Sequence, residues 1–272
     1  MRILHTSDWH LGHTLYNQDR DEEQRDMLEQ MAAIAADRKP DVFLVSGDLY
    51  HTSQPPAAVQ HMLSDALVKI AEANSGMTVV VTAGNHDSGS RHEIFRTPWL
   101  AVNVHAIGTL DPDNPEKHII EIPGKGYVIA LPYCHERNMP EGYVRKLLDM
   151  VEERNKEGLP VVMSAHTTVK GCDFTGHDNA SEYSAGGIDC TDISSFGEGY
   201  DYLALGHIHH AQYVHTGRHN ARYSGTPLPV SFDETYRHTV SLADIPHHGA
   251  TPTLETIEIS LSLIHISEPT RH

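Results

Sequence analysis

Apolar and polar positions alternate over the first hundred residues in a pattern that predicts strands and helices in turn. The apolar runs in "RILHTSD", "DVFLVSGD" and "MTVVVTAGNHD" are expected to be buried strands, and each ends at a small residue or a carboxylate. Residues 20–39 and 55–74, which lie between these runs, carry apolar side chains at helical spacing. This alternation predicts parallel strands joined by right-handed crossovers.

The pattern changes after about residue 100, where short strands separated by turn residues indicate an antiparallel or mixed sheet. Strands are expected in "VNVHAIG", "KHIIEI", "GYVIALP", "LPVVMSAHTT", "YDYLALGHIHHAQYV", "ARYSGTP" and "RHTVSLADI". One further helix fits residues 141–158. Together these elements predict an α/β fold in which two sheets pack face to face, with helices on the outside.

Composition narrows the class of protein only slightly. The 272 residues are 39% hydrophobic and 21% charged, which is typical of a soluble globular chain with one large or two small domains. No apolar run reaches about 18 residues and the N-terminus lacks an apolar signal core, so we expect no membrane partner and a cytoplasmic location. The three cysteines lie far apart and predict neither a disulfide framework nor a zinc–thiolate site.

The charge balance bears on possible partners. Twenty basic and 37 acidic residues give a net charge of −17, which argues against a surface that is basic throughout and binds nucleic acid. Bound cations, however, can supply positive charge where a phosphate must lie. The 22 histidines are unusually many, and several of them follow predicted strands.

Side chains able to bind metal follow five of the predicted strands, in "SDWH", "SGDLYH", "AGNHD", "SAH" and "LGHIH". Because the carboxyl ends of strands in α/β sheets meet at one crevice, we expect these groups to lie together. In "DWH" and "HIH" the outer side chains point the same way, while Trp9 and Ile208 point into the body of the protein. The candidate residues are Asp8, His10, Asp48, His51, Asn85, His86, Asp87, His166, His207 and His209.

The residue types favour a particular metal chemistry. Oxygen and imidazole ligands without thiolates suit manganese, iron or zinc. Two neighbouring cations need an anion between them, and Asp48, at the end of a central strand, is the best placed carboxylate. Paired cations are a common device for hydrolysing phosphoesters. One histidine alone would more often be structural, but five such segments in this order favour a metal centre.

The order D-x-H, GD, GNHD, H and GHIH resembles the calcineurin-like metallophosphoesterase superfamily. The longer stretches "ILHTSDWHLG", "VSGDLYHTSQPP", "TAGNHD", "LALGHIHHAQ" and "YSGTPLPVSFDE" are similar to its bacterial double-strand-break repair nucleases, over about residues 1–240. The resemblance implies a four-layer metallophosphoesterase sandwich with two mixed β-sheets flanked by helices. It also implies two divalent metal ions, which we expect to be manganese.

The resemblance assigns the ligands residue by residue. One metal is assigned to Asp8, His10, Asp48 and His209, and the other to Asp48, Asn85, His166 and His207, so that Asp48 bridges. His86 matches the catalytic histidine that assists the departing oxygen, and His51 matches a second active-site histidine of some relatives. Asp87 is expected to orient His86 or an adjacent backbone group. His13 and His210 receive no role.

The resemblance further implies a partner and an activity. The expected enzyme is a DNA exonuclease on duplex ends and an endonuclease on single strands and hairpins, working in DNA repair, recombination and replication with an ATPase partner. A homodimer is expected, formed through helices near the N-terminal motifs. Residues 55–71 are a candidate dimer surface and equally a candidate for an ordinary helix that packs on the sheet.

Other functions and the limits of the domain stay open at this point. A phosphoesterase for small nucleotides or phosphoproteins would use the same metals, and a non-catalytic scaffold could keep the same fold. We expect residues 1–259 to form the nuclease domain and residues 260–272, including "SLIHISEPTRH", to be a non-native tail. We expect the capping domain and the partner-binding C-terminus of relatives to lie outside this sequence.

Overall fold

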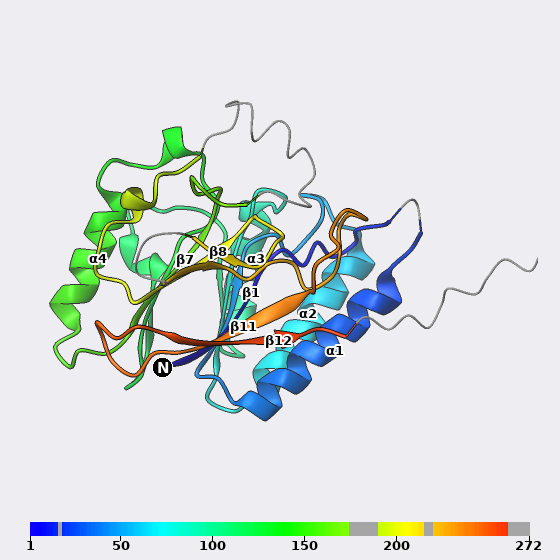
Figure 1. Ribbon diagram of the computed structural model, residues 1–272, viewed down its shortest axis with the longest axis horizontal. Coiled ribbons are helices and arrows are strands. Elements are labelled where there is room, and N and C mark those ends of the chain that lie inside the picture. Colours follow the sequence, from blue (N-terminus) through cyan, green and yellow to red (C-terminus); the bar gives the residue numbers. More distant parts are fainter. Residues whose placement is uncertain (16–17, 174–189, 215–219, 261–272) are drawn as a thin grey trace, which may run out of the picture.

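The short apolar runs of the N-terminal half form the first of two sheets in the computed structural model (Figure 1). The structure describes residues 1–15, 18–173, 190–214 and 220–260. The parallel strands are β1 (Arg2–Thr6), β2 (Val42–Ser46), β3 (Thr78–Thr82) and β4 (Val104–Ile107). Two antiparallel strands, β11 (Thr239–Asp244) and β12 (Thr253–Glu258), extend this sheet beyond β1.

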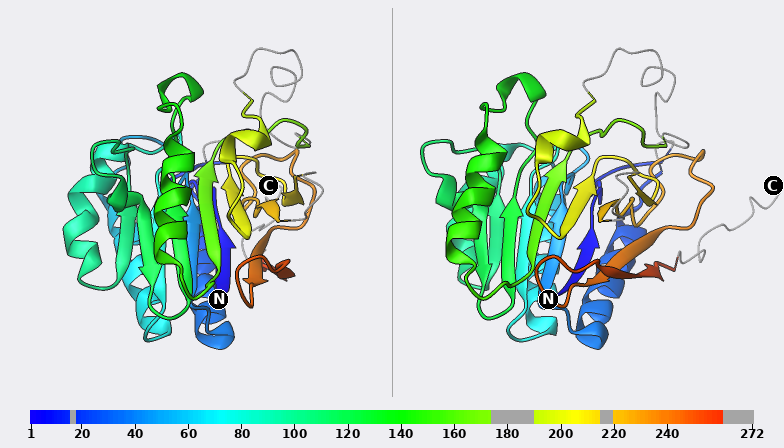
Figure 2. Two further views of the ribbon diagram at one scale, coloured as in Figure 1. Left: turned by 90° about the vertical axis from the view of Figure 1, so that its left-hand side faces the viewer. Right: turned by 60° about the vertical axis from the view of Figure 1, so that its left-hand side comes forward.

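The second sheet is mixed, as the spacing of its turns predicts. Its order is β5-β6-β7-β8-β10-β9, with parallel pairing from β6 to β10 and antiparallel strands at both edges. The strands are β5 (Ile119–Ile122), β6 (Gly126–Ala130), β7 (Val161–His166), β8 (Tyr202–Gly206), β9 (Gln212–Tyr213) and β10 (Ala221–Tyr223). Figure 2 shows the central strands of both sheets pointing to the same end of the molecule.

Helices cover the outer faces of the two sheets. On the first sheet these are α1 (Asp21–Arg38) and α2 (Ala57–Ala73), and α4 (Tyr143–Arg154) covers the second on the opposite side (Figure 1). Helix α3 (Gly89–Leu100) follows β3 and lies beside β4. Short 3₁₀ helices are η1 (Pro115–His118), η2 (Glu136–Asn138) and η3 (Ile193–Phe196). The four-layer sandwich predicted from the sequence is therefore confirmed.

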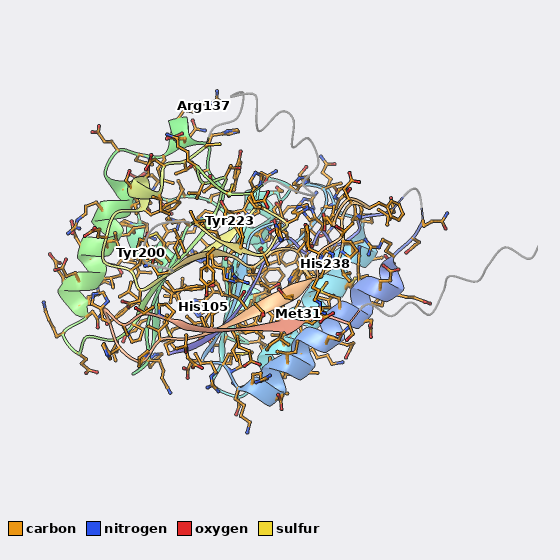
Figure 3. The ribbon with its side chains drawn as sticks, viewed as in Figure 1. Met31, His105, Arg137, Tyr200, Tyr223 and His238 are labelled. Atoms are coloured by element: carbon orange, nitrogen blue, oxygen red, sulfur yellow. The ribbon has the colours of Figure 1, made fainter. Side chains whose placement is uncertain are left out.

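Three hydrophobic cores hold these layers together. Met31 of α1 belongs to the core between the first sheet and its helices, and Tyr223 belongs to the core under α4 (Figure 3). The third core lies between the sheets, where Ile3, Val80 and Val162 are fully buried. Burying each large apolar side chain stabilises the fold by about 1.5–3 kcal/mol. Because both faces of each sheet are covered, the central strands read as continuous apolar runs.

Two elements, α3 and β12, differ from what the hydrophobic pattern predicts. Helix α3 buries only His92 and Trp99 and contains Pro98, so its sequence lacks an apolar stripe of helical period. Strand β12 lies at the edge of its sheet and is mostly exposed or half-exposed, so its sequence is rich in polar residues. Hydrophobic periodicity alone therefore predicts neither α3 nor β12.

The structure also bears on the predictions for residues 55–71, for the C-terminal tail and for membrane-spanning helices. The apolar face of α2 is buried in the core, which favours the sheet-packing interpretation of residues 55–71 over a dimer surface. The predicted tail lies almost entirely outside the described residues, because its residues 261–272 are not among them. Within the described part of the chain, no helix combines the length and apolar character that a membrane crossing requires.

Candidate metal centre

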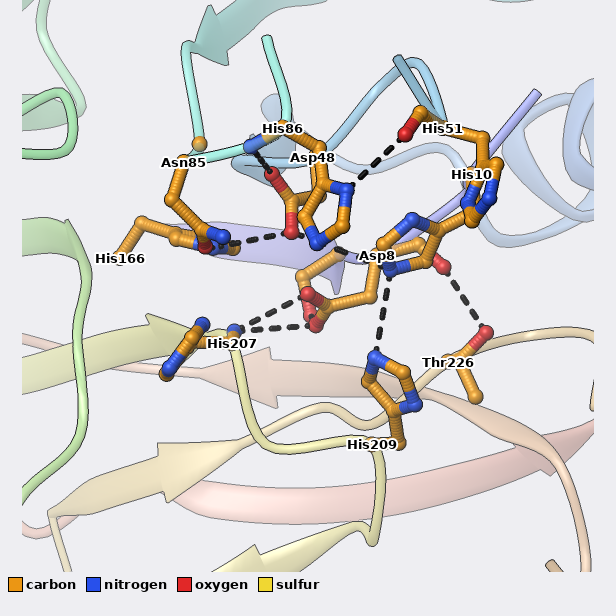
Figure 4. Close-up of polar contacts among 12 residues, drawn as sticks. Asp8, His10, Asp48, His51, Asn85, His86, His166, His207, His209 and Thr226 are labelled. Carbon is orange, nitrogen blue, oxygen red and sulfur yellow. Dashed lines mark hydrogen bonds and ion pairs between the residues drawn. The ribbon is translucent and has the colours of Figure 1, made fainter. Parts of the chain in front are cut away.

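The carboxyl ends of five strands bring the predicted metal ligands together (Figure 4). His166 is the last residue of β7, and the other ligands lie in the loops after β1, β2, β3 and β8, so both sheets contribute. The residues are separated by up to two hundred positions in the chain and meet only because the two sheets are stacked with these ends in common. The seven ligands predicted are Asp8, His10, Asp48, Asn85, His166, His207 and His209.

One group consists of Asp8, His10 and His209, whose ligand atoms lie within 4.8 Å of one another. The Nε2 atoms of His10 and His209 are 3.2 Å apart. All three residues are buried. Two imidazole nitrogens and a carboxylate that converge in this way have the composition of a divalent cation site.

A second group consists of Asp48, His166 and His207, again with ligand atoms within 4.8 Å. The amide oxygen of Asn85 lies 3.0 Å from Nε2 of His166, and Oδ2 of Asp48 lies 3.2 Å from the same nitrogen. Asn85 therefore lies next to this group, and its role as a ligand stays a prediction.

Asp48 stands between the two groups. Its Oδ2 is 3.2 Å from Nε2 of His166 in one group and 3.8 Å from Nε2 of His10 in the other. Its Oδ1 accepts a hydrogen bond of 2.9 Å from the backbone N–H of His86. A carboxylate in this position can share its negative charge between two cations and offset their repulsion.

The backbone at these positions is strained. Six non-glycine residues in the described part of the chain have positive φ, and four of them belong to the two groups. They are Asp8 (φ 55°), His10 (φ 45°), Asp48 (φ 51°) and His207 (φ 98°). Such conformations cost about 1–3 kcal/mol each and concentrate at functional sites, where the surrounding fold enforces them. The fold is therefore less stable than it would be with relaxed backbone at these positions, and in return these side chains are held in a fixed orientation.

Two glycines give these side chains room. A Cβ atom at Gly84 would lie 2.1 Å from Oδ1 of Asp48, and one at Gly47 would lie 2.1 Å from Nδ1 of His166. Gly47 also has φ 88°, which other residues rarely adopt. The glycines that end β2 and β3 are therefore required by the packing of the ligands and not only by the turns.

Hydrogen bonds fix which ring nitrogen each of two histidines presents. Nδ1 of His166 donates to the backbone oxygen of Ser46 at 2.8 Å, and Nδ1 of His209 lies 2.9 Å from Oε1 of Glu234. In both rings Nε2 is left to face the centre. Partners of this kind are usual around metal-binding histidines, where they set ring orientation and raise ligand basicity.

Glu234 is a functional candidate that the analysis of the sequence missed. Its side chain is fully buried, and its second oxygen accepts from the backbone N–H of Val230 at 3.3 Å. It lies in the loop between β10 and β11 and does not follow a strand directly, so the rule that found the other residues passes over it. The only available signal is its place in the quoted stretch "YSGTPLPVSFDE".

The pKa shifts in the centre differ between its groups. Burial raises the pKa of Asp8, while burial and the surrounding imidazoles lower the pKa of His10 well below its ordinary value. For His166 burial acts against protonation, but the carboxylates of Asp48 and Asp8 outweigh it and raise the pKa to about 9. The pKa of His209 is raised in the same way, mainly by Glu234 and Asp8. Protons and cations therefore compete for these nitrogens.

The donor set fits divalent cations. It combines carboxylate, amide and imidazole donors without a thiolate, and the buried groups already face one another at ligand separations. Buried charged groups need such compensation, because leaving them unpaired costs several kcal/mol each. The residues present are thus suited to hold two cations, one at each group.

His86 and His51 lie at the side of the centre next to His10. Nδ1 of His86 donates to the backbone oxygen of His51 at 2.9 Å, and the ring of His86 lies 4.9 Å from that of His10. The rings of His51 and His86 stack with centroids 5.7 Å apart, and ligand atoms of His10, His51 and His86 come within 4.8 Å of one another. Both predicted histidines therefore lie beside the group that contains His10.

Asp87, which we expected to orient His86 or an adjacent backbone group, contacts backbone groups. Its buried carboxylate accepts from the backbone N–H groups of Leu49, Tyr50 and Gly84, at 2.8 to 3.1 Å. No bond to the His86 ring is among its contacts in the described chain, so the alternative of an adjacent backbone group is the one that holds. Asp87 ties the loop after β2 to the loop after β3 because one carboxylate satisfies three amides.

Comparison with protein families and curated proteins gives one consistent relationship. The family model described as calcineurin-like phosphoesterase matches residues 1–211. The SbcD subunit of the SbcCD nuclease from Rhodobacter capsulatus is 32% identical over 93% of this chain and 68% of its own length. The Escherichia coli K12 protein of the same name is 27% identical over 96% of this chain and 69% of its own length. The chain thus spans about two thirds of the length of these relatives.

Solved structures share the fold at low sequence identity. A Thermus thermophilus protein, TT1561, superposes with a TM-score of 0.59 and 15% identity, covering 95% of this chain and 99% of the other. A dimetal phosphatase from Danio rerio gives a TM-score of 0.54 at 12% identity, covering 96% of this chain and 99% of the other. These likenesses concern the architecture of the two sheets.

Proposed function

Because the chain belongs to the calcineurin-like phosphoesterase family, and within it to the relatives of the SbcD subunit of the SbcCD nuclease, we propose that it is a metal-dependent DNA nuclease that hydrolyses phosphodiester bonds. The observation that carries this proposal is the pair of ligand groups on either side of Asp48, in which all the predicted ligands except His207 and Asn85 are buried. The ligands are oxygen and nitrogen atoms without a thiolate, which suit manganese, iron or zinc. Among these metals we propose manganese, as the resemblance to the metallophosphoesterase nucleases implies.

The proposal assigns each predicted ligand to one of two cations, with Asp48 shared between them. Asp8, His10, Asp48 and His209 would hold one cation, and Asp48, Asn85, His166 and His207 the other. When bound, the two cations supply charge neutralisation for the phosphoryl oxygens and lower the pKa of water. Ser46 and Glu234 hold the rings of His166 and His209 so that their Nε2 atoms face the centre.

His86 is the proposed proton donor or hydrogen-bond donor to the departing sugar oxygen. Its Nδ1 donates to the backbone oxygen of His51, which fixes the ring and leaves Nε2 for the substrate. Because Nδ1 already carries one proton, Nε2 can donate to the departing oxygen only in the imidazolium form of the ring. The backbone N–H of His86 is bonded to Asp48, so the ring position is tied directly to the shared ligand. His51 supports this geometry through its backbone and through the stacking of its ring.

A nuclease assay with a matched variant tests the proposal. We expect purified protein with Mn²⁺ to cleave single-stranded and hairpin DNA and to degrade duplex ends, and His86→Ala to lower cleavage about 10²–10⁴-fold, as loss of a general acid does. Mn²⁺ binding should persist in His86→Ala, because the ligand groups are intact. Hydrolysis of nucleoside monophosphates or phosphoproteins without cleavage of DNA would instead support the phosphatase alternative.

The names of the relatives support a partner as well. We propose that the protein carrying this chain works with a SbcC-like ATPase in DNA repair, recombination and replication, as one component of a SbcCD-type nuclease. Residues 1–259 are proposed to form the nuclease domain. A measurable association of this chain with purified SbcC would place part of the binding surface within these residues.

A homodimer is also proposed, with α3 in place of α2 as its surface. Three large apolar side chains at or just after α3 are exposed: Ile94 by 72%, Leu100 by 50% and Val102 by 37%. The outer face of α2 instead carries polar residues such as His61, Asp65 and Lys69. A second copy packed on α3 would remove this apolar surface from water.

A further inference from the structure

Three histidines, His10, His51 and His86, form a further set of possible ligands, called here the histidine group. Their ligand atoms lie within 4.8 Å of one another, with His10 buried and the other two half-buried. The ring of His13 lies 4.6 Å from that of His51 and nearly perpendicular to it, at 73°, so a fourth imidazole adjoins the group. Several imidazoles thus gather at one place without a carboxylate among them.

The ligand types in the histidine group differ from those in the other two groups. Each of the other groups contains a carboxylate, Asp8 in one and Asp48 in the other, whereas the histidine group offers only imidazole nitrogens. Carboxylate oxygens suit manganese, and imidazole suits zinc, copper and nickel, which bind nitrogen donors more tightly than manganese does. Three histidines that leave a fourth position open are a common zinc site. The histidine group is therefore suited to zinc and poorly suited to manganese.

The ring of His10 can serve two cations because it lies between two sets of ligands. His209 lies on one side of this ring, and His51 and His86 lie on the other (Figure 4). Nε2 of His10 lies 3.2 Å from Nε2 of His209, while its Nδ1 is buried and has no hydrogen-bond partner in the described part of the chain. Leaving a buried nitrogen without a partner is costly, and histidines that bind metal usually engage both ring nitrogens. A cation in the histidine group would supply the partner that Nδ1 lacks.

A cation in the histidine group would also occupy the nitrogen that the proposed reaction needs. Nδ1 of His86 donates to the backbone oxygen of His51 at 2.9 Å, so Nε2 is the nitrogen left for a cation or a substrate. A nitrogen whose lone pair is bound to zinc cannot carry the proton that the departing oxygen requires. Binding of zinc and the proposed role of His86 in cleavage therefore exclude each other.

We propose that His10, His51 and His86 form a third cation site, which prefers zinc to manganese and inhibits cleavage when it is filled. The site is additional to the two proposed manganese sites and shares only His10 with them. Its inhibitory effect rests on the proposed nuclease function, whereas zinc binding itself does not. Zinc replaces the remaining proton of the His10 ring, which passes to solvent. The imidazolate that is left carries a negative charge between two cations and offsets part of their repulsion.

Counting both metals on the wild-type protein tests the site directly. The protein is dialysed against saturating Mn²⁺ with increasing Zn²⁺, and the bound metals are measured by mass spectrometry. We expect two Mn²⁺ per chain throughout, with one Zn²⁺ added to them. Cleavage of single-stranded DNA should fall about 10²–10⁴-fold as Zn²⁺ fills the site, as for loss of a general acid. Zinc that enters only by displacing manganese one for one would overturn the inference.

The variant His51→Ala isolates the third site. It removes one ligand of the histidine group and none of the seven predicted ligands of the manganese sites, and it keeps the backbone oxygen that accepts from His86. We expect its affinity for Zn²⁺ to fall by at least about 10–100-fold, which is the loss when even an outer partner of a ligand is removed. His61→Ala is the matched control, because His61 lies on the exposed face of α2 and outside the three groups.

The outcomes separate the third site from the function beneath it. Equal affinity for Zn²⁺ in the wild type and in His51→Ala would overturn the site, whether or not the protein cleaves DNA. Full cleavage with Zn²⁺ bound beside two Mn²⁺ would overturn its inhibitory effect. Failure of the wild type to cleave DNA with Mn²⁺ alone would overturn the nuclease and leave the metal count standing. That count needs no variant, so it decides even if His51→Ala does not fold.

Discussion

At the scale of single residues, the centre depends on groups that touch no cation. Glu234 orients His209, Ser46 orients His166 and Asp87 holds three backbone amides in the loops after β2 and β3. Each acts through a buried hydrogen bond, and such bonds are costly to leave unsatisfied. The orientation of the ligand side chains is therefore set by residues that contact the ligands or their loops and are not ligands themselves.

Glu234→Gln should weaken metal binding by about 10–100-fold, because the neutral amide no longer sets the tautomer and basicity of His209. Isothermal titration with Mn²⁺ measures this directly, without reference to activity. Asp233→Asn is the control, since the adjacent carboxylate is exposed and lies outside both ligand groups. Unchanged affinity in Glu234→Gln would show that His209 is held by the rest of its packing.

Gly84→Ala should displace Asp48 and so weaken both cation sites together. The added Cβ would lie 2.1 Å from Oδ1 and 2.3 Å from the backbone nitrogen of Asp48, so the loop must shift. We expect two weakened binding steps in an Mn²⁺ titration. Gly124→Ala, where nothing lies within 4 Å of the new Cβ, should cost about 1 kcal/mol of stability and leave metal binding unchanged.

At the scale of elements, α2 and α3 differ in whether their apolar side chains are buried. Helix α2 packs its apolar face on the first sheet with Val59, Leu63, Leu67 and Ile70 buried. Helix α3 follows the His86 loop, contacts β4 and exposes apolar side chains. Helix α2, whose sequence contains a continuous apolar stripe, thus buries that stripe in the core. Helix α3, whose apolar residues are scattered, exposes several of them.

Ile94→Glu on α3 should shift the protein toward monomer if this helix forms the dimer surface. The charge would be buried between two copies, which weakens association by several kcal/mol. Analytical ultracentrifugation over a range of concentrations measures the change. The control is His61→Glu on the polar outer face of α2, which should leave the association constant unaltered. Equal effects of the two variants would argue against α3 as the dimer surface.

At the scale of the whole molecule, the two sheets are held by an apolar core that also contains polar groups. His5 of β1 is fully buried, and its Nδ1 lies 3.0 Å from the hydroxyl of Tyr202 on β8. Arg222 of β10 donates to the Ser241 hydroxyl of β11 at 3.0 Å. These contacts join the first sheet to the second and so fix how the loops of both sheets meet at the metal centre.

The stability of this interface should depend on pH through His5. Burial and the nearby charge of Arg222 lower its pKa from 6.5 to about 3, so the native state keeps the ring neutral while the unfolded chain binds a proton below pH 6.5. The free energy of unfolding should therefore fall by about 2 kcal/mol from pH 7 to pH 5 because of this group alone. The measurement is urea unfolding in a chelator, compared with His5→Gln.

The variant isolates the contribution of His5 from that of other titrating groups. His5→Gln is expected to start less stable at pH 7, because it disturbs the contact with Tyr202, and to lose about 2 kcal/mol less between the two pH values. Parallel pH dependences of the two proteins would show that His5 takes up its proton equally well when folded.

The sequence by itself determined the succession of strands and helices, and it determined which side chains could bind metal. Both follow from local features: apolar runs such as "VFLVS" form strands wherever they are buried, and Asp8, His10 or His209 stand just after such runs. Helix α3 escaped prediction because Pro98 and its exposed apolar residues leave no periodic stripe.

Tertiary structure alone decided how these side chains divide and what supports them. The separation into two groups around Asp48 and the hydrogen bond from His209 to Glu234 both join segments that are distant in the chain. The same holds for Asp87, which accepts hydrogen bonds from backbone N–H groups in the loops after β2 and β3. Distances between loops depend on the stacking of the two sheets, and no local pattern encodes that stacking.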